Sequence, residues 1–265
     1  MEISITETKE RINQIINWLT KIKEKTNCRG VVIGLSGGKD STTVAMLAKR
    51  VWGDNMLGVM MPNGYQSDLD DSIKIAQKLN IKYKIIDIGG TYSSLIDSIE
   101  TVPLMDSDGL PLPTPSGIEL NSKTKTNIPP RLRMTVLYAI AQSLGYRVIG
   151  TGNLSEAYVG WCTKWGDSAY DFNPIGNLTC SEVKEIGRVL ANEYGLPLTY
   201  IDKAPSDGLT GKSDEENFGF TYDMLDEYIL SGSISDEAAK LKIDNMHNAT
   251  YHKREMPITF ITPRL

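Results

Sequence analysis

The sequence has few of the residues that build disulfide frameworks and zinc sites. Its 265 residues include three cysteines and two histidines, and no two cysteines form a C-x-x-C pair. An odd, widely spaced set of cysteines argues against a disulfide framework and against a zinc site. It favours a reducing compartment, so we expect a cytoplasmic protein. No apolar run approaches the ~18 residues of a membrane span, and residues 1–9 lack the apolar core of a signal peptide. No membrane partner is expected.

The chain also lacks an excess of basic residues. It has 28 lysines and arginines against 33 aspartates and glutamates, which gives a net charge of −5 and a pI near 5.2. This balance argues against nucleic acid as a partner, although a local basic pocket stays possible. The hydrophobic content of 40% is enough for a substantial core, and we expect a single domain over residues 1–265.

Short apolar runs alternate with helical patterns along the chain. Strands are expected at 31–35, 56–61, 82–88 and 147–151, and helices at 7–25, after Gly38, after Ser67 and at 132–144. Thr179 and Glu182 form a capping box, which predicts a helix that ends at Gly195, and two short helices follow it. The alternation predicts an α/β fold: a doubly wound parallel sheet with helices on both faces, whose ligands bind at the carboxyl ends of the strands.

Two stretches break this alternation. Residues 101–130 contain six prolines, which predict that no long helix forms there. A loop of this length inside a compact domain usually has a function. Residues 203–217 form a second stretch that we expect to be irregular.

The most informative segment covers residues 31–41, where an apolar run leads into S-G-G-K-D-S and then into a helical pattern. The two glycines let backbone N–H groups approach a phosphate, and the two serines add hydroxyl donors. A carboxylate at Asp40 would repel phosphate unless Mg²⁺ lay between them, so the segment predicts an ATP–Mg²⁺ site. A Walker A loop would need Ser or Thr directly after the lysine, where this chain has Asp40. An ordinary strand-to-helix turn would explain the glycines but not the whole unit.

The segment resembles the pyrophosphatase loop of the N-type ATP pyrophosphatases, the PP-loop superfamily that includes NAD, GMP, asparagine and argininosuccinate synthetases. In these enzymes an oxygen nucleophile attacks the α-phosphate of ATP and pyrophosphate leaves. An amine or ammonia then captures the adenylated intermediate. The resemblance implies an adenine nucleotide alpha-hydrolase-like fold.

Ordered motifs in the second half narrow the resemblance to the NAD synthetases. The chain has R-L-R-M at 131–134, T-G-N-L-S-E at 151–156, T-K-W-G-D at 163–167, D-F-N-P-I-G at 171–176 and H-K-R at 252–254. This order and spacing are typical of that family. The resemblance implies an ATP-dependent carbon–nitrogen ligase of NAD biosynthesis. ATP would adenylate the nicotinate carboxylate of deamido-NAD, and ammonia would then displace AMP to form the amide.

The resemblance also implies roles for individual residues. Asp40 and Glu156 would hold Mg²⁺ and act in catalysis with Asp167, which would position or deprotonate ammonia. The ATP-binding residues would be Gly34, Leu35, Ser36, Gly37, Gly38, Lys39, Asp40, Ser41, Thr151, Cys180 and Ser206. Deamido-NAD would be bound by Arg131, Lys164, Asp171, His252 and Lys253. Taken alone, each of these residues also has a non-functional explanation, such as a charge that caps a helix or a solvated side chain on the surface. The order of the motifs favours the functional interpretation.

The chain departs from the family at two places. Most NAD synthetases have a lysine that contacts the ATP phosphates at the position of Cys180, and we hypothesise that Lys39 restores this charge from the other side. Cys180 also follows a predicted helix N-cap, which favours a thiolate, whereas a buried thiol there would be inert. Pro129 and Pro130 stand before Arg131 where the family commonly has a non-proline pair, so we expect the entry to that helix to be repositioned.

These departures leave other functions open. One alternative is a related ATP-dependent amide ligase that acts on a different carboxylate. A PP-loop tRNA-modifying enzyme would usually have catalytic cysteine pairs and a basic surface, and the sequence shows neither. A non-catalytic nucleotide-binding regulator would not need both Asp40 and Glu156.

The resemblance bears on the nitrogen source and on assembly. Glutamine-dependent NAD synthetases carry an additional glutaminase domain, whereas one helix and one strand are expected before Gly34, so we expect free ammonia to be the donor. Members of the family are homodimers, and the helix at 131–144 is our candidate for the interface.

Overall fold

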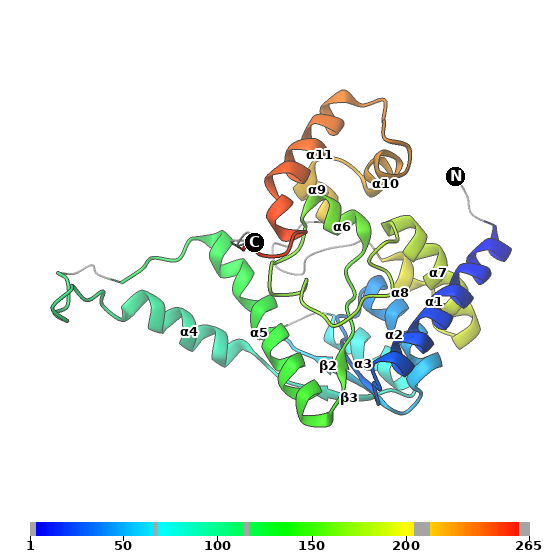
Figure 1. The fold of residues 1–265 in the computed structure, drawn as a ribbon, viewed down its shortest axis with the longest axis horizontal. Coiled ribbons are helices and arrows are strands. Elements are labelled where there is room, and N and C mark those ends of the chain that lie inside the picture. Colours follow the sequence, from blue (N-terminus) through cyan, green and yellow to red (C-terminus); the bar gives the residue numbers. More distant parts are fainter. Residues whose placement is uncertain (1–3, 66–67, 114–116, 204–212, 260–265) are drawn as a thin grey trace, which may run out of the picture.

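The computed structural model describes residues 4–65, 68–113, 117–203 and 213–259 (Figure 1). In these residues the central sheet has four parallel strands in the order β3-β2-β1-β4. The strands are β1 (Val31–Gly34), β2 (Met56–Met60), β3 (Lys82–Ile85) and β4 (Arg147–Val148). The four predicted strands are confirmed, but β3 ends at Ile85 rather than at 88, and β4 is shorter than expected because Ile149 bridges to Phe172 after the pairing with β1 ends.

Helices cover both faces of the sheet, as predicted. Val31 and Ile33 of β1 pack into one apolar cluster with α1 (Ile5–Lys25), α2 (Lys39–Trp52) and α7 (Cys180–Tyr194). Val32 points to the other face and packs with α5 (Ser122–Leu144). This division follows from the alternation of side chains along a strand. The doubly wound α/β fold is therefore confirmed.

A third apolar cluster forms a helical layer beyond the carboxyl ends of the strands (Figure 1). It contains Phe218, Phe220, Tyr222, Leu225 and Ile243, all of which are buried. The helices of this layer are α6 (Leu154–Val159), α9 (Asp214–Phe218), α10 (Tyr222–Ser231) and α11 (Glu237–Ala249). The two short helices predicted near the end of the chain are confirmed as α10 and α11.

The remaining elements are α3 (Leu69–Lys78), α4 (Gly89–Thr101), α8 (Thr199–Asp202) and the 3₁₀ helix η1 (Tyr251–Lys253). The helix expected after Ser67 is α3, but Ser67 lies outside the described residues. Asp68 holds the N-cap position of α3 and makes no side-chain capping bond. Among the described residues, no helix has the length and apolar character needed to cross a membrane.

The prediction that residues 101–130 contain no long helix is wrong. Helix α5 begins at Ser122 and continues through Pro129 and Pro130 to Leu144. Each proline removes one backbone donor from the helix. The Asn121 side chain caps the first turn of the helix by accepting from the N–H of Thr124 at 2.8 Å. Pro129 is also buried, so tertiary packing supports the helix where local preference opposes it.

The prediction that residues 203–217 are irregular is wrong at the end of the stretch and is not tested over most of it. Residues 204–212 are not described, and α9 occupies 214–218. Ser213 caps this helix, since its hydroxyl accepts from the N–H of Glu216 at 3.2 Å. The capping box at Thr179 and Glu182 is confirmed, and α7 ends at Gly195 with a positive φ of 65°.

Candidate active site

The loop between β1 and α2 is shaped by two glycines. Gly37 has a φ of +79°, which a residue with a side chain rarely adopts. A Cβ atom at this position would lie 3.0 Å from the carbonyl oxygen of Asp68 and 3.0 Å from the Ser72 hydroxyl. Gly38 is the N-cap of α2, so the free N–H groups of the first helical turn follow it directly. The loop therefore has the form that the sequence predicted for binding an anion.

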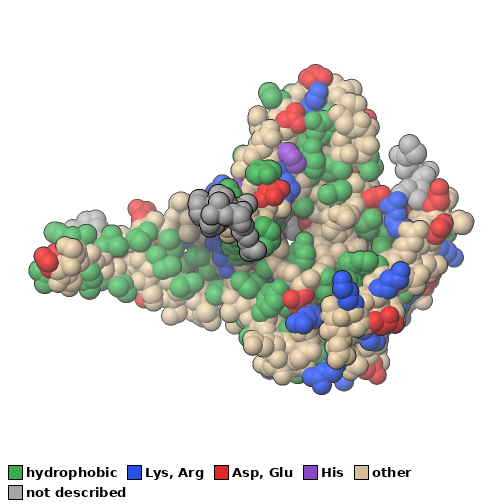
Figure 2. Space-filling model, viewed as in Figure 1, with side chains coloured by type: hydrophobic (Ala, Val, Ile, Leu, Met, Phe, Trp, Pro, Cys, Tyr) green, Lys and Arg blue, Asp and Glu red, His purple; other side chains and the backbone are tan. Residues whose placement is uncertain are grey.

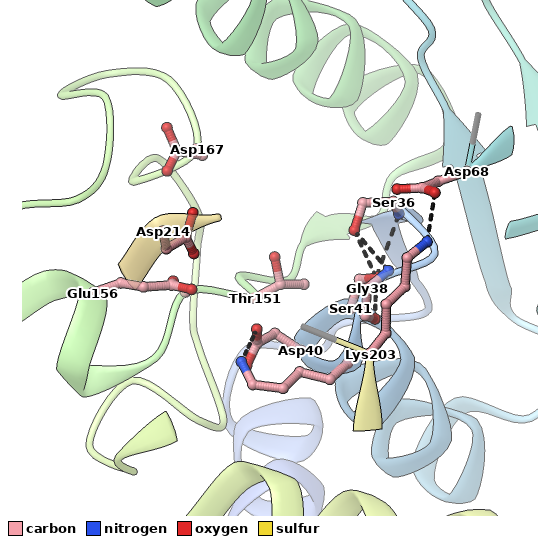
Figure 3. A pocket seen from close by; sticks show the side chains of 12 residues that line it. Ser36, Gly38, Asp40, Ser41, Asp68, Thr151, Glu156, Asp167, Lys203 and Asp214 are labelled. Atoms are coloured by element: carbon pink, nitrogen blue, oxygen red, sulfur yellow. Dashed lines mark hydrogen bonds and ion pairs between the residues drawn. The ribbon is translucent and has the colours of Figure 1, made fainter. Parts of the chain in front are cut away.

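A cavity of about 200 Å³ lies at the end of this loop (Figure 3). It is lined by Ser36, Gly38, Lys39, Asp40, Ser41, Asp68, Thr151, Gly152, Glu156, Asp167, Lys203 and Asp214. Most of these residues come from the two predicted motifs, at 36–41 and at 151–156. Gly34, Leu35 and Gly37 were also predicted to bind ATP, but they do not line the cavity. Ser206 lies outside the described residues.

The two serines of the loop are held close together. The Ser36 and Ser41 hydroxyl oxygens are 3.0 Å apart, and the Ser41 hydroxyl donates to the carbonyl oxygen of Gly38 at 3.1 Å. The N–H of Gly38 donates to the Ser36 hydroxyl at 3.3 Å. These bonds hold both hydroxyls beside the N-terminus of α2, where each can rotate its single proton from its present acceptor toward a phosphate oxygen.

Asp40 and Glu156 are linked through Asn153, a residue that sequence reasoning missed. The Asn153 amide Nδ2 donates to Asp40 Oδ1 at 3.3 Å, and its Oδ1 accepts from the N–H of Glu156 at 3.0 Å. Asn153 is fully buried and caps α6. Its place inside T-G-N-L-S-E was the available signal. Burial, followed by the charge of Asp40, raises the pKa of Glu156 above its ordinary value. A cation bound between Asp40 and Glu156 would therefore be favourable, because it would offset the repulsion between the two carboxylates.

The two carboxylates fit Mg²⁺ that arrives with a nucleotide. Mg²⁺ prefers hard oxygen ligands and is usually bound by one or two carboxylates together with substrate phosphates and water. Asp40 and Glu156 both face the cavity beside the predicted phosphate-binding loop (Figure 3). In the described part of the chain, no group of three or more Asp, Glu, His or Cys side chains could hold a metal ion. Phosphate oxygens and water would therefore have to complete the coordination.

Lys39 is a buried cation in the wall of the same cavity. Its side chain is only 4% exposed, and its Nζ donates to Asp40 Oδ2 at 2.6 Å. The ammonium also lies 5.8 Å from the centre of the Tyr222 ring. Burial disfavours the charged form, but the surrounding acidic groups, Asp40 foremost, raise the pKa of Lys39 above its ordinary value. Lys39 therefore stays protonated across the working range of an enzyme.

Asp167 lies at the far wall of the cavity. Its Oδ1 accepts from the N–H of Thr163 at 2.8 Å. The side chain is exposed and lines the cavity, and desolvation by the neighbouring protein raises the pKa of Asp167. Arg133 is a nearby residue that the predicted roles did not include. Burial lowers the pKa of Arg133, the charge of Asp167 opposes this change, and its Nε donates to the carbonyl oxygen of Met61 at 3.0 Å.

The residues predicted to bind deamido-NAD do not line this cavity. Four of them form a chain of contacts beside it: Arg131 Nε donates to the Lys164 carbonyl oxygen at 3.4 Å, and Lys164 Nζ donates to the His252 carbonyl oxygen. Lys253 Nζ donates to the carbonyl oxygens of Gly160 and Cys162, at 2.7 and 2.6 Å. The structure thus brings together residues more than 100 positions apart in the sequence. Their role in binding stays a prediction.

Asp171 has a different place. Its Oδ2 accepts from the N–H of Val148 at 2.7 Å, and its own N–H donates to the Val148 carbonyl oxygen at 2.9 Å. These bonds attach the segment around Phe172 to β4. Asp171 therefore has a structural role at the sheet edge, next to the site.

Three charged residues of the cavity lie outside the predicted motifs. Lys203 Nζ forms ion pairs with Asp68 and Asp71, which joins the end of α8 to the first turn of α3. Asp214 is buried and accepts a hydrogen bond from the Tyr222 hydroxyl at 2.9 Å. No pattern in the sequence marks these positions, because their place depends on how distant helices pack. Gly152, in contrast, stands inside T-G-N-L-S-E.

Cys180 is a buried thiol rather than a thiolate. Its side chain is in the third apolar cluster, and burial raises its pKa to about 12. The N–H of Cys180 donates to the Ser155 hydroxyl at 2.9 Å. The predicted burial of the thiol is confirmed, and the raised pKa favours the thiol over the thiolate, whereas its inertness stays a prediction. Cys180 does not line the cavity.

We expect Cys180 to resist alkylation in the native protein. At pH 8 iodoacetamide should modify it at least about 100-fold more slowly than in guanidinium chloride, because burial suppresses the thiolate. Peptide mapping by mass spectrometry would give the rate at each cysteine, with half-buried Cys162 as an internal comparison. Equal rates for Cys180 in native and unfolded protein would contradict the buried site.

Known proteins are similar to this chain in sequence and in fold. The family model described as NAD synthase matches residues 11–257. The NH(3)-dependent NAD(+) synthetase of Carboxydothermus hydrogenoformans is 39% identical over 250 residues, which cover 94% of this chain and 96% of that protein. Among solved structures, an NMN synthetase from Francisella tularensis superposes with a TM-score of 0.82 at 33% identity, covering 97% of this chain and 99% of the other. An NH3-dependent NAD synthetase from Campylobacter jejuni, in complex with nitrate, gives a TM-score of 0.72 at 26% identity, covering 96% and 99%. The chain belongs to the NAD synthase family.

Proposed function

We propose that this protein is an ammonia-dependent NAD synthetase. It would use ATP to adenylate the nicotinate carboxylate of deamido-NAD and then form the amide with ammonia. The observation that carries the proposal is the joint placement of Asp40 and Glu156 on one cavity, beside a loop built to bind phosphate. Family membership supports the same reaction.

The first step would occur at the loop of β1 and α2. Backbone N–H groups of α2 and the hydroxyls of Ser36 and Ser41 would hold the phosphates of ATP. A carboxylate oxygen of deamido-NAD attacks the α-phosphorus, the bond to the bridging oxygen breaks, and pyrophosphate leaves. Mg²⁺ held by Asp40 and Glu156 would neutralise charge on the phosphates and on the leaving pyrophosphate. Thr151 lines the cavity where it would contact the adenylate part of ATP.

The second step needs ammonia rather than ammonium. Asp167 has a raised pKa and is accessible from the cavity, so it would accept a proton from ammonium or orient the neutral molecule. The ammonia nitrogen attacks the carbonyl carbon of the adenylate, and the bond from this carbon to the phosphate oxygen breaks. AMP leaves with that oxygen. Arg131, Lys164, Asp171, His252 and Lys253 stay our candidates for binding deamido-NAD.

A second candidate substrate follows from one structural neighbour. The solved structure from Francisella tularensis is named an NMN synthetase, and it matches this chain at 33% identity over 97% of its length. The same adenylation chemistry could therefore act here on nicotinate mononucleotide, which lacks the adenylate half. Parallel assays of purified protein with ATP, Mg²⁺, ammonium and either deamido-NAD or nicotinate mononucleotide would decide. Higher kcat/KM with deamido-NAD supports the proposal, and higher kcat/KM with the mononucleotide supports this alternative.

Lys39 would contact the ATP phosphates during the reaction. At saturating Mg²⁺, Lys39→Ala should raise the KM for ATP by about tenfold, because a charge-assisted bond to phosphate is lost. Lys49→Ala is a matched control, since Lys49 lies on the same helix and pairs with Asp54 outside the cavity. Steady-state kinetics with varied ATP would measure the effect. Unchanged ATP kinetics in Lys39→Ala would refute this role.

We also propose that the chain acts as one catalytic domain, in the cytoplasm, as a homodimer. Helix α4 and the segment after it extend away from the sheet, and the chain comes back toward the sheet before α5 begins; the described residues 89–113 and 117–121 form an arm (Figure 1). Figure 2 shows apolar side chains gathered along this arm. Exposed large apolar residues on it are Leu95, Val102, Leu104, Met105, Leu110, Leu112 and Ile118. Such a surface supports an interface that includes the arm and extends to the predicted helix at 131–144.

The arm gives a direct test of assembly. Leu104→Glu combined with Leu112→Glu should convert a dimer to a monomer, because both side chains are exposed apolar groups of the arm. Leu230→Glu is the control, since Leu230 is 67% exposed on α10 in the helical layer. Light scattering after size-exclusion chromatography would give the mass. Monomeric parent protein, or a dimer in the double variant, would count against the arm as an interface.

A further inference from the structure

Lys39 stands where a lysine is unfavourable unless it has a specific partner. It is the first residue of α2, and the positive end of the helix dipole lies at this terminus. Its side chain is also 4% exposed, so the ammonium has lost nearly all of its water. Both effects oppose a positive charge at this position. The neighbouring carboxylates must therefore compensate for them.

The compensation comes from the carboxylates that fit Mg²⁺. Lys39 Nζ binds Asp40 Oδ2 at 2.6 Å, while Asn153 Nδ2 binds Asp40 Oδ1 at 3.3 Å. Both oxygens of Asp40 therefore already have a donor. Lys39 supplies the positive charge nearest to Asp40, and Glu156 adds a further attraction to it. A divalent ion bound to Asp40 Oδ2 would be repelled by the ammonium, which lies 2.6 Å from the same oxygen.

We propose that Lys39 is a resident counter-cation that holds Asp40 in the nucleotide-free protein and gives up this carboxylate when a divalent ion arrives with ATP. The released ammonium would then bind the phosphates, which are the new anions in the cavity. Before ATP arrives, no anion of that kind is available to receive it. The exchange thus couples binding of the divalent ion to binding of the nucleotide. The inference rests on the proposed function for the ion and the nucleotide, but its test needs neither turnover nor ATP.

The test is titration of nucleotide-free protein with Mn²⁺, followed by electron paramagnetic resonance of the unbound ion. Lys39→Met removes the charge and keeps the length of the side chain. We expect it to bind Mn²⁺ more tightly than the parent protein by at least about tenfold, because the competing cation is gone. Lys39→Gln is a second neutral variant that keeps an N–H donor for Asp40, in case the methionine variant does not fold. It should bind Mn²⁺ more tightly as well.

Lys49→Met is the matched control, because it removes one positive charge from the same helix at a site paired with Asp54. Its Mn²⁺ affinity should stay within about twofold of the parent value, since Lys49 lies further along α2 than Lys39 by ~15 Å at the helical rise per residue, which is more than a Debye length. Unchanged or weaker binding in the folded Lys39 variants would overturn the proposal, and so would equal tightening in Lys49→Met. The outcome is separate from that of the NAD assay. Protein that makes NAD but shows no tightening retains the proposed function and loses this inference.

Discussion

Asp40→Asn should lower kcat/KM for NAD formation by at least about 100-fold, the size of effect seen when one electrostatic contact to a reacting group is removed. The substitution keeps the shape of the side chain and removes its charge. Asp40 faces the cavity from the first turn of α2, with Glu156 opposite it (Figure 3). Neutral asparagine would no longer balance Lys39 or contribute a charged ligand for Mg²⁺. NAD formation followed by chromatography would measure the loss.

Two observations separate this effect from unfolding. Asp70→Asn is the matched control, because Asp70 is exposed in the first turn of α3 and does not line the cavity. It should retain parental kcat/KM. Circular dichroism should show the same helix content for both variants and the parent. If Asp40→Asn kept parental activity, the role given to this carboxylate would be wrong.

Gly187→Leu should lower the free energy of unfolding by about 3 kcal/mol, through overpacking of the contact between α7 and α2. Gly187 is buried in α7, and a Cβ atom there would lie 2.6 Å from Thr43 Oγ1 and 3.0 Å from Ile201 Cγ2. Glycine in a helix is normally unfavourable by about 1 kcal/mol relative to alanine. Its presence here is explained by the close approach of the two helices. Urea denaturation followed by circular dichroism would measure the change.

The control is a glycine with open surroundings. Gly90 is exposed in the first turn of α4, and no atom lies within 4 Å of a Cβ built on it. Gly90→Leu should leave the free energy of unfolding unchanged or raise it by about 1 kcal/mol, because leucine favours helix more than glycine does. A stabilised Gly187→Leu protein would show that α7 and α2 do not pack as closely as described.

The part of the site that could be predicted from the sequence comes from the geometry of parallel sheets. Asp40 and Glu156 are 116 positions apart, but each follows a strand, and β1 and β4 are neighbours in the sheet. The carboxyl ends of parallel neighbours meet at one edge, so the two turns that we propose to bind phosphate and metal had to converge there. The same argument could place the two loop serines and Thr151 on one cavity.

Other parts depend on packing that no local pattern records. Pro129 and Pro130 signal the end of a helix, but α5 continues through both of them, and Pro129 is buried by tertiary packing. Lys203 and Asp214 reach the cavity only because α8 and α9 pack near it, and neither follows a predicted strand. Prediction from the sequence uses the local backbone preferences of residues and the periodicity of apolar residues. Neither of these records which distant helices contact each other.

Lys39 and Cys180 illustrate how information from the sequence and information from the structure combine. The sequence raised the hypothesis that one charge replaces another, because Cys180 stands where the family usually has lysine. The structure places the Lys39 ammonium in the cavity and within electrostatic reach of Cys180, whose thiol stays neutral. Only the structure shows that Lys39 also binds Asp40 Oδ2. That contact turns a hypothesis about ATP binding into one about exchange of cations.

Oxygen transfer tests the central claim most directly. Purified protein would be incubated with ATP, Mg²⁺, ammonium and deamido-NAD whose nicotinate carboxylate carries ¹⁸O, and the products analysed by mass spectrometry. Adenylation of the carboxylate predicts NAD and AMP in equal amounts, with one labelled oxygen in the phosphate of each AMP. Absence of NAD, or AMP without label, would contradict the account.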